Sequence, residues 1–321
     1  MSAPAISVVM AAFNAAETLS EAIDSILGQS FPDFEFIILD DGSTDGTADI
    51  VSNYADERIR LVADNENRGL THRLNQGLSL ARADIIARMD ADDVAHKERF
   101  QRQFDRLLDD ATLDLVFSNA EIIDAAGDLT GRSHIDLSGE TALDHLRDSG
   151  NVLIHSSAMM RKAAIDRVGG YDPALRTRQD YDLWMRCLEA GYRLEVMEAP
   201  LLKLRVHDGS ISSSGRRNWQ LNCVVAARSV LRQSGMVPFP GIEEMMDRAG
   251  RLPEVDRYVS AIETKRRLRM SKGVKRGLVA AQLLAGGKFQ RLADAVRPTS
   301  MAPARQAIVR VYEEARDARP A

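Results

Sequence analysis

The chain has 321 residues, a formal net charge of -5, and a composition of 45% hydrophobic and 28% charged residues that is typical of a globular protein. This length predicts one large domain with a smaller appendage. The negative net charge argues against a protein that grips nucleic acid through a general basic surface. We therefore expect no nucleic-acid partner.

No segment has the pattern of an export signal or of a membrane span. Residues 1–5 carry no basic region, and a strand pattern follows them directly. The longest apolar stretch, 278–285, is far shorter than the roughly 20 residues that a membrane span needs. Cys187 and Cys223 lack partners at metal-ligand spacing and are expected to be small core residues. These features predict a cytoplasmic protein.

The first third of the chain alternates between strand and helix patterns. Short apolar runs rich in β-branched residues predict buried strands, and amphipathic stripes predict helices. The expected elements are a strand at 6–12, a helix at 17–27, a strand at 34–39, a helix at 47–54, a strand at 59–63, a helix at 70–81, a strand at 85–89 and a helix at 97–108. This order predicts a mostly parallel sheet with right-handed crossovers, covered by helices.

The later part of the chain divides at about residue 215. A helical stripe begins at Asp180, and residues 200–206 have the pattern of a strand. Residues 216–321 lose the strand signals and become helical in composition, with a first amphipathic stretch at 219–231. We therefore expect an α/β domain over 1–215 and a helical C-terminal region over 216–321.

Three carboxylates, Asp90, Asp92 and Asp93, directly follow the predicted strand at 85–89. Like charges at the end of a buried strand are costly unless a cation neutralises them. Oxygen ligands suit a hard divalent ion, Mg²⁺ or Mn²⁺, which in turn bridges phosphates. A second interpretation stays open, because carboxylates also favour the first turn of a helix such as the one at 97–108.

Other polar residues follow the neighbouring predicted strands. Asn14 follows the first strand, and Asp40 and Asp41 follow the second. Ligands of parallel sheets bind beyond the carboxyl ends of the strands, so these residues share one rim with the carboxylates. A carboxylate here could accept a hydrogen bond from a nucleobase. The Gly, Ser and Thr of this turn also fit a simple helix start, capped by Thr44 or Asp45.

Several other nucleotide and nucleophile patterns do not occur in the sequence. There is no G-x-G-x-x-G after the first strand, no G-x-x-x-x-G-K-[ST] and no G-x-S-x-G. These absences disfavour a nicotinamide enzyme, a P-loop NTPase and an α/β-hydrolase. A bound nucleotide would be held by side chains and a metal.

Five segments together form a pattern with a fixed order and spacing. They are Ser7-Val8-Val9-Met10-Ala11-Ala12-Phe13-Asn14, Ile38-Leu39-Asp40-Asp41-Gly42-Ser43-Thr44-Asp45, Asn67-Arg68-Gly69-Leu70, Asp90-Ala91-Asp92-Asp93 and Arg178-Gln179-Asp180-Tyr181-Asp182-Leu183-Trp184-Met185-Arg186. Over about residues 5–215 this pattern resembles the family 2 glycosyltransferases. The resemblance implies a GT-A fold, which is a Rossmann-like, mostly parallel sheet flanked by helices. It also implies a nucleotide-sugar donor, a divalent metal (Mn²⁺ or Mg²⁺) and inversion at the anomeric carbon.

The same resemblance implies roles for individual residues of the rim. Asp41 would read the edge of the donor base, Asp90 would bind the ribose, and Asp92 would bind the metal. Asp93 is left to the following helix. The residues expected to bind the nucleotide sugar are Ala12, Phe13, Asn14, Asp41, Arg68 and Asp90.

Asp180 falls on the position of the family's catalytic base. Its position at the start of a helix leaves a second interpretation open, since Asp is also a good N-cap. Gln179 replaces the Glu that is usual in the family's ED pair, which puts the role of position 179 in doubt. Asp182 is expected to be a surface charge.

Two histidines are further candidates. His207 lies in a segment, Arg205 to Ser212, that resembles the R-x-H-x-x-S-x-S pattern near the end of the family's catalytic domain. The resemblance implies that His207 completes metal or diphosphate binding, and we expect it to bind the metal. His155 resembles a residue of a strand that borders the acceptor site. Each histidine also fits an ordinary hydrogen-bonded residue.

The predicted function is that of an inverting glycosyltransferase. It would move a sugar from a UDP-sugar to a hydroxyl of a saccharide or lipid-linked acceptor, in the synthesis of a cell-surface polysaccharide or glycolipid. The basic segment 265–276 precedes an apolar stretch and fits contact with the inner face of a membrane, or a solvated helix face or oligomer contact. The alternatives for the whole chain are a non-catalytic nucleotide-sugar binding module and a nucleotidyltransferase on a related fold.

Overall fold

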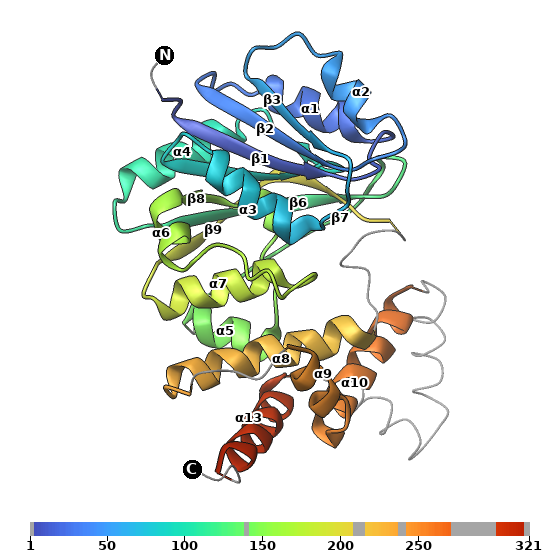
Figure 1. Cartoon of the computed structure of the whole chain (residues 1–321), viewed down its shortest axis with the longest axis vertical. Coiled ribbons are helices and arrows are strands. Elements are labelled where there is room, and N and C mark those ends of the chain that lie inside the picture. Colours follow the sequence, from blue (N-terminus) through green and yellow to red (C-terminus); the bar gives the residue numbers. More distant parts are fainter. Residues whose placement is uncertain (1–2, 138–140, 208–215, 237–241, 271–299, 318–321) are drawn as a thin grey trace, which may run out of the picture. The chain divides into compact units, whose positions relative to one another are not determined.

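The computed structural model describes residues 3–137, 141–207, 216–236, 242–270 and 300–317 (Figure 1). The chain divides into two compact units. The first unit comprises Met1–Leu143 and Val152–Ser213, and the second comprises Asp144–Asn151 and Ser214–Ala321.

The first unit is built on a parallel sheet of four strands with the order β3-β2-β1-β4. Three helices connect these strands, as the alternating pattern of the sequence predicted. The elements are β1 (Ile6–Ala12), α1 (Leu19–Leu27), β2 (Phe34–Asp41), α2 (Thr47–Ser52), β3 (Ile59–Asp64), α3 (Leu70–Leu80) and β4 (Ile85–Asp90). The prediction of an α/β fold with a mostly parallel sheet is confirmed.

Five more strands extend the sheet beyond β4, giving the order β3-β2-β1-β4-β8-β6-β9-β5, with β7 paired to β6. Strand β8 runs antiparallel to both β4 and β6, whereas β6 and β9 are parallel. The remaining elements of this unit are β5 (Val94–Ala95), α4 (Arg99–Asp109), β6 (Leu115–Ile123), β7 (Leu129–Arg132), the short 3₁₀ helix η1 (His155–Ser157), β8 (Met159–Arg161), α6 (Lys162–Arg167), α7 (Gln179–Glu189) and β9 (Leu194–Arg205).

Two predictions about this region need correction. The strand expected at 200–206 already begins at Leu194, because Leu194 pairs with Leu115 of β6 in a register that the local pattern does not reveal. His155, which resembles a residue of a strand, begins η1 instead, and β8 starts only at Met159.

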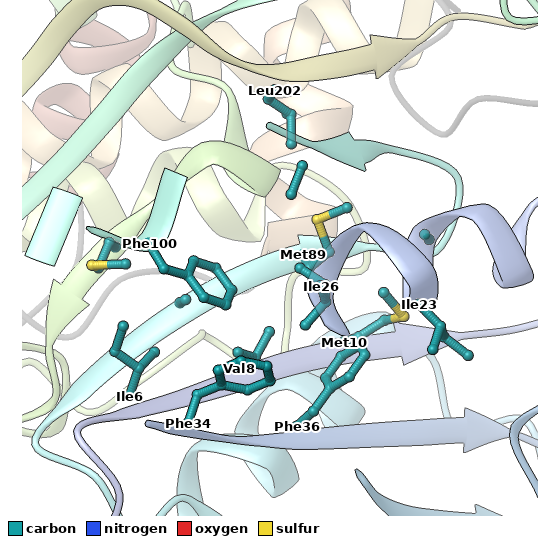
Figure 2. Close-up of a cluster of buried hydrophobic side chains, with 14 of the residues drawn as sticks. Ile6, Val8, Met10, Ile23, Ile26, Phe34, Phe36, Met89, Phe100 and Leu202 are labelled. Atoms are coloured by element: carbon teal, nitrogen blue, oxygen red, sulfur yellow. The ribbon is translucent and has the colours of Figure 1, made fainter. Parts of the chain in front are cut away.

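A core of apolar side chains fills the face of the sheet covered by α1 and α4. Figure 2 shows Val8, Met10, Phe36 and Met89 from the strands and Phe100 from α4 within this cluster. Each fully buried side chain of this size contributes about 1.5–3 kcal/mol. Because side chains alternate along a strand and Met89 points into this core, its neighbours on β4 point to the opposite face.

Helix α3 packs on that opposite face at very short range. A Cβ atom added to Gly77 would lie 2.4 Å from Cγ1 of Val9 and 3.1 Å from Cδ1 of Leu39. Glycine at this position therefore lets the helix lie directly on β1 and β2.

We expect Gly77→Ala to destabilise the protein. Overpacking costs about 1–3 kcal/mol and outweighs the gain of about 1 kcal/mol in helix propensity. Urea unfolding would measure the change, with Ser79→Ala on the exposed side of the same helix as the control. A Gly77→Ala protein as stable as the control would show that the helix does not lie this close to β1.

The second unit is helical where it is described. It contains α5 (Ala142–Ser149, whose first two residues belong to the first unit), α8 (Arg216–Gln233), α9 (Ile242–Gly250), α10 (Pro253–Met270) and α13 (Ala302–Asp317). Within it, Nε of Arg147 donates to Oγ of Ser229 (3.0 Å), and the amide of Met301 donates to the carbonyl of Asp148 (2.8 Å). Cys223 of α8 is buried and free, as is Cys187 of α7.

The expected membrane contact of this region falls largely outside the described structure. Residues 271–299 include the end of the basic segment 265–276 and the apolar stretch at 278–285, and they lie outside the described residues. Among the helices that are described, none combines the length and the apolar character of a membrane span. The assignment of 216–321 to acceptor, membrane or oligomer contact stays a prediction.

Candidate active site at the carboxyl ends of the strands

The loops after β1 and β2 are joined by hydrogen bonds. The amide of Asn14 donates to Oγ of Ser43, and Oδ1 of Asn14 accepts from the amide of Thr44, both at 2.9 Å. Asn14 has a left-handed backbone with a φ of 48°, which asparagine tolerates better than most residues. Ala12 is buried, whereas Phe13 is 49% exposed. Asn14 therefore holds the two loops together, and the ring of Phe13 is open at the rim.

The second loop is closed by Asp45. Its Oδ1 accepts from the amide of Thr47, the first residue of α2, at 3.1 Å. Its Oδ2 accepts from the amide of Ala16 at 3.0 Å. The helix-start interpretation thus accounts for Asp45. Asp40 also serves this turn, because its Oδ2 accepts from the amide of Ser43 at 3.3 Å, so only Asp41 has no bond within the turn.

Asp41 is buried, and its own chain uses most of its capacity to accept hydrogen bonds. Its Oδ1 accepts from the amide of Arg68 (2.8 Å) and from Nε of Arg73 (2.6 Å), and its Oδ2 accepts from the amide of Gly69 (2.8 Å). A carboxylate has about four acceptor positions, so about one remains for a nucleobase. The carboxylate shapes the loop at 68–69, and the side chain of Arg68 is half exposed beside it.

Arg73 is a residue of this site that was not predicted from the sequence. It is fully buried and bonds Asp41, Oδ2 of Asp64 (3.1 Å) and the carbonyl of Glu66 (3.0 Å). The bonds to Asp41 and Asp64 raise its pKa. A signal was present, because Arg73 stands in the buried stripe of α3 between Leu70 and Gly77, where an unpaired charge is not tolerated.

The carboxylates of Asp90, Asp92 and Asp93 meet at the end of β4. Each offers one oxygen, and these oxygens all lie within 4.8 Å of one another. Burial and the charge of Asp90 raise the pKa of Asp92, and burial with both neighbouring charges raises the pKa of Asp93 to about 8. Repulsion of this kind is relieved by a cation, and an oxygen-rich donor set fits a hard divalent ion. The cluster could therefore hold a metal.

His207 joins this cluster from the end of β9. Its Nε2 lies 3.2 Å from Oδ2 of Asp92, although 115 positions separate the two residues. Neutral imidazole is a common metal ligand in proteins, so His207 could complete a site that carboxylates begin. The structure thus brings together the two residues predicted to bind metal, while residues 208–215 of the same sequence pattern lie outside the described residues.

The expectation that Asp93 belongs to the following helix is wrong. Asp93 accepts hydrogen bonds from Oγ of Ser156 and from the amide of Arg205 (2.8 Å), and it is buried. Helix α4 begins only at Arg99, with Glu98 at its N-cap, after β5 has intervened. The second interpretation of the three carboxylates, as a helix N-terminus, therefore fails as well.

Two buried arginines lie next to the carboxylates, and neither was singled out from the sequence. Arg88 precedes Asp90 on the same face of β4 and donates to its carboxylate from Nη2. Its Nε and Nη1 are buried without a hydrogen-bond partner among the described residues. Arg99 donates to the carbonyl of Arg88 at 2.8 Å. Burial lowers the pKa of Arg99 to about 9, which still leaves it charged at neutral pH.

Asp180 is the second residue of α7, so it is not the N-cap that the alternative interpretation required. Arg178 takes that position, with a left-handed φ of 62°. Asp180 is half-buried, and Gln179 before it is buried. Asp182 is not the surface charge that we expected, because it is fully buried and pairs with Arg186 at 2.7 Å.

A buried group of rings lies beside Asp180. Nε2 of His155 and the hydroxyl of Tyr171 are 2.8 Å apart, and the ring of His155 meets that of Trp184 edge-on at 5.9 Å. Burial and the charge of Arg88 hold the pKa of His155 well below its usual range, so the ring is neutral. Burial raises the pKa of Tyr171, and the charges of Asp180 and Asp90 add to this effect. The negative charges of Asp180 and Asp90 therefore both act on the hydroxyl of Tyr171.

Comparison with known proteins gives concordant matches. Residues 7–169 match the family model described as Glycosyl transferase family 2. EpsE of Bacillus subtilis (strain 168) is 35% identical over 209 residues, which are 64% of this chain and 74% of EpsE. The succinoglycan biosynthesis protein ExoO of Rhizobium meliloti (strain 1021) is 31% identical over 224 residues, 65% of this chain and 63% of ExoO.

Solved structures with the same fold include two with bound nucleotide sugars. S. aureus TarS 1–349 in complex with UDP-GlcNAc has a TM-score of 0.56 at 15% identity, covering 97% of this chain and 92% of TarS 1–349. The mannosyltransferase PcManGT from Pyrobaculum calidifontis, in complex with GDP-Man and Mn²⁺, has a TM-score of 0.53 at 19% identity, covering 92% of this chain and 79% of PcManGT. At these identities the likeness establishes the fold alone.

Proposed function

This chain belongs to glycosyl transferase family 2 and is a glycosyltransferase, and from this premise we propose that it moves a sugar from a UDP-sugar to an acceptor hydroxyl with inversion at the anomeric carbon. The observation that carries the proposal is the cluster of Asp90, Asp92, Asp93 and His207 on the same rim as the open ring of Phe13. Such a rim can take a base, a ribose and a diphosphate in sequence along the ends of the strands.

The donor half of the site would be formed by the loops after β1, β2 and β3. Phe13 would stack on the base, and the last acceptor position of Asp41 would take a hydrogen bond from it. Arg68 would contact the base or the ribose, and Asp90 would contact the ribose hydroxyls. Uracil as the donor base is supported by TarS, whose structure holds UDP-GlcNAc. Guanine is the alternative base, because PcManGT holds GDP-Man.

Asp92 and His207 would hold a divalent metal, Mn²⁺ or Mg²⁺, as PcManGT holds Mn²⁺. When bound, such an ion neutralises the charge that develops on the leaving nucleoside diphosphate.

The acceptor half would be governed by Asp180. As the acceptor oxygen attacks the anomeric carbon, the Asp180 carboxylate takes the hydroxyl proton. The bond from the anomeric carbon to the diphosphate oxygen breaks on the opposite side, and its electron pair leaves with the nucleoside diphosphate. One carboxylate suffices, because the leaving group needs no proton from a second acid.

We also propose that the acceptor is a saccharide or lipid-linked saccharide of a polysaccharide pathway in the cytoplasm. This proposal is supported by the relative ExoO, whose name is that of a succinoglycan biosynthesis protein. The basic segment 265–276 would serve a lipid-linked acceptor at the inner face of the membrane.

A thermal-shift panel tests the donor proposal. UDP, dTDP and GDP, each alone and as a sugar conjugate, are added with Mn²⁺ or with EDTA. A ligand at 100 times its Kd stabilises the native state by about 2.7 kcal/mol. We expect UDP and one UDP-sugar to raise the Tm, and only when Mn²⁺ is present.

Other outcomes of the panel would change the proposal. Stabilisation by GDP alone would replace uracil by guanine as the base. If no nucleotide shifted the Tm, the donor site proposed on this rim would be wrong.

A further inference from the structure

Helix α3 contacts both halves of the site through different side chains. Arg73 reaches the donor-side residues Asp41 and Asp64, whereas Asn75 and Thr71 reach the loop that leads to Asp180. We infer that Asn75 is a positioning residue, which fixes this loop and through it the catalytic base. The inference rests on the proposed role of Asp180.

The side-chain amide of Asn75 bonds both the carbonyl and the N–H of the Tyr171 backbone. Nδ2 of Asn75 donates to the carbonyl of Tyr171 at 2.8 Å, and Oδ1 accepts from the amide of the same residue at 2.9 Å. The two bonds use the donor and the acceptor of one side chain and define its orientation. A single side chain thus satisfies both the amide and the carbonyl of this loop residue.

The loop is built to receive this side chain. Gly170 has a left-handed φ of 68°, and a Cβ atom there would lie only 2.8 Å from Oδ1 of Asn75. Thr71, one turn earlier on α3, donates from its hydroxyl to the carbonyl of Leu175. The loop is therefore fastened to α3 at Tyr171 and again at Leu175, which lies five residues before Asp180.

The fastened loop continues into the residues around the base. The hydroxyl of Tyr171 bonds His155, and the ring of His155 packs on Trp184. Trp184 lies four positions after Asp180 on α7, which places both on one face of that helix. A shift of Tyr171 would therefore move His155 and the face of α7 that carries the base.

Displacing a catalytic group by about 1 Å can cost about 100-fold in rate. Replacing Asn75 by Leu removes both bonds to Tyr171 and keeps a side chain of similar size. Donor-side residues keep their contacts, because Arg73 and Asp41 are not touched. Asn75→Leu should thus lower turnover and leave donor binding unchanged. A general loss of stability would lower both.

The experiment uses the full chain and four variants, Asn75→Leu, Asn75→Ala, Asp180→Asn and the double variant Asn75→Leu/Asp180→Asn. Calorimetry with UDP and Mn²⁺ measures donor-side binding. Release of UDP from the UDP-sugar selected by thermal shift, with water as acceptor, measures turnover. Hydrogen–deuterium exchange compares the amides of 170–182 with those of 64–69. Ser79→Ala, exposed on α3, is the control.

We expect Asn75→Leu to lower kcat by about 30- to 100-fold and to leave the Kd of UDP within about twofold. Exchange should rise at 170–182 and not at 64–69. The double variant should be no slower than Asp180→Asn, because Asn75 acts through the base. Asn75→Ala should behave in the same way and replaces the Leu variant if that protein does not fold.

The inference is overturned by unchanged turnover and exchange, by a parallel loss of UDP affinity and turnover, or by a double variant that multiplies the two single losses. Failure of the proposed function has another signature. In that case Asp180→Asn turns over as fast as wild type, or no UDP-sugar is consumed, while the exchange at 170–182 still rises in Asn75→Leu.

Discussion

Replacing Asp180 by Asn is expected to lower sugar transfer by about 10³-fold, inside the range of about 10²–10⁴ for a lost general base. The amide of Asn has the shape of the carboxylate but cannot take a proton from an acceptor hydroxyl. Binding of UDP and Mn²⁺ should not change, since Asp180 lies on α7, whereas the donor loops follow β1, β2 and β3 and the proposed metal ligands follow β4 and β9. Steady-state release of UDP and calorimetry with UDP would measure the two effects.

The control for this variant is Glu189→Gln, which removes a carboxylate from the last position of the same helix. It should keep full activity. If Asp180→Asn transferred sugar at the wild-type rate, Asp180 would not be the base. If it lost UDP binding in proportion to activity, its role would lie in the donor site or in the fold.

Asp92→Asn is expected to abolish the metal dependence of UDP binding and to lower turnover by about 10³-fold, because charge neutralisation at the leaving group is worth several kcal/mol. Burial and the charge of Asp90 raise the pKa of Asp92, and its carboxylate lies 3.2 Å from Nε2 of His207. An amide keeps the bond to His207 but removes the negative charge that binds the ion. Calorimetry with UDP in Mn²⁺ and in EDTA gives the readout.

A graded series makes this second prediction sharper. His207→Ala should weaken the Mn²⁺ effect less than Asp92→Asn, since it removes a neutral ligand. Asp128→Asn, in the exposed turn before β7, should leave it unchanged. Metal-dependent UDP binding that survives Asp92→Asn would remove Asp92 from the metal site.

Local patterns in the sequence were sufficient for the framework of the first unit. Strands β1 to β4 and helices α1 to α3 lie within one or two residues of their expected limits. Each could be predicted because the spacing of apolar residues that defines it lies within its own segment. Placement of the carboxylates on a rim also followed from local information, since parallel strands end on one side. The family resemblance then supplied the activity, which the matches bear out.

Contacts between distant segments were not accessible in this way. Arg73, Arg88 and Arg99 are fully or almost fully buried charges, and only Arg73 has a signal in the sequence, its place in the apolar stripe of α3. Hydrogen-bond and charge partners from other segments offset the cost of this burial, as Asp41 and Asp64 do for Arg73. Asp93 was misassigned for the same reason, because its partners Ser156 and Arg205 come from outside its own neighbourhood.

The sequence by itself therefore determined the alternating α/β order, the acidic end of β4 and the family of the protein. Only the tertiary structure decided that His207 meets Asp92, that Asp41 bonds the loop after β3, and that Asn75 holds the backbone of Tyr171 in the loop that leads to Asp180. The physical reason is that periodicity is read within a few residues. A buried polar group, in contrast, is satisfied by whichever donor or acceptor the folded chain brings to it.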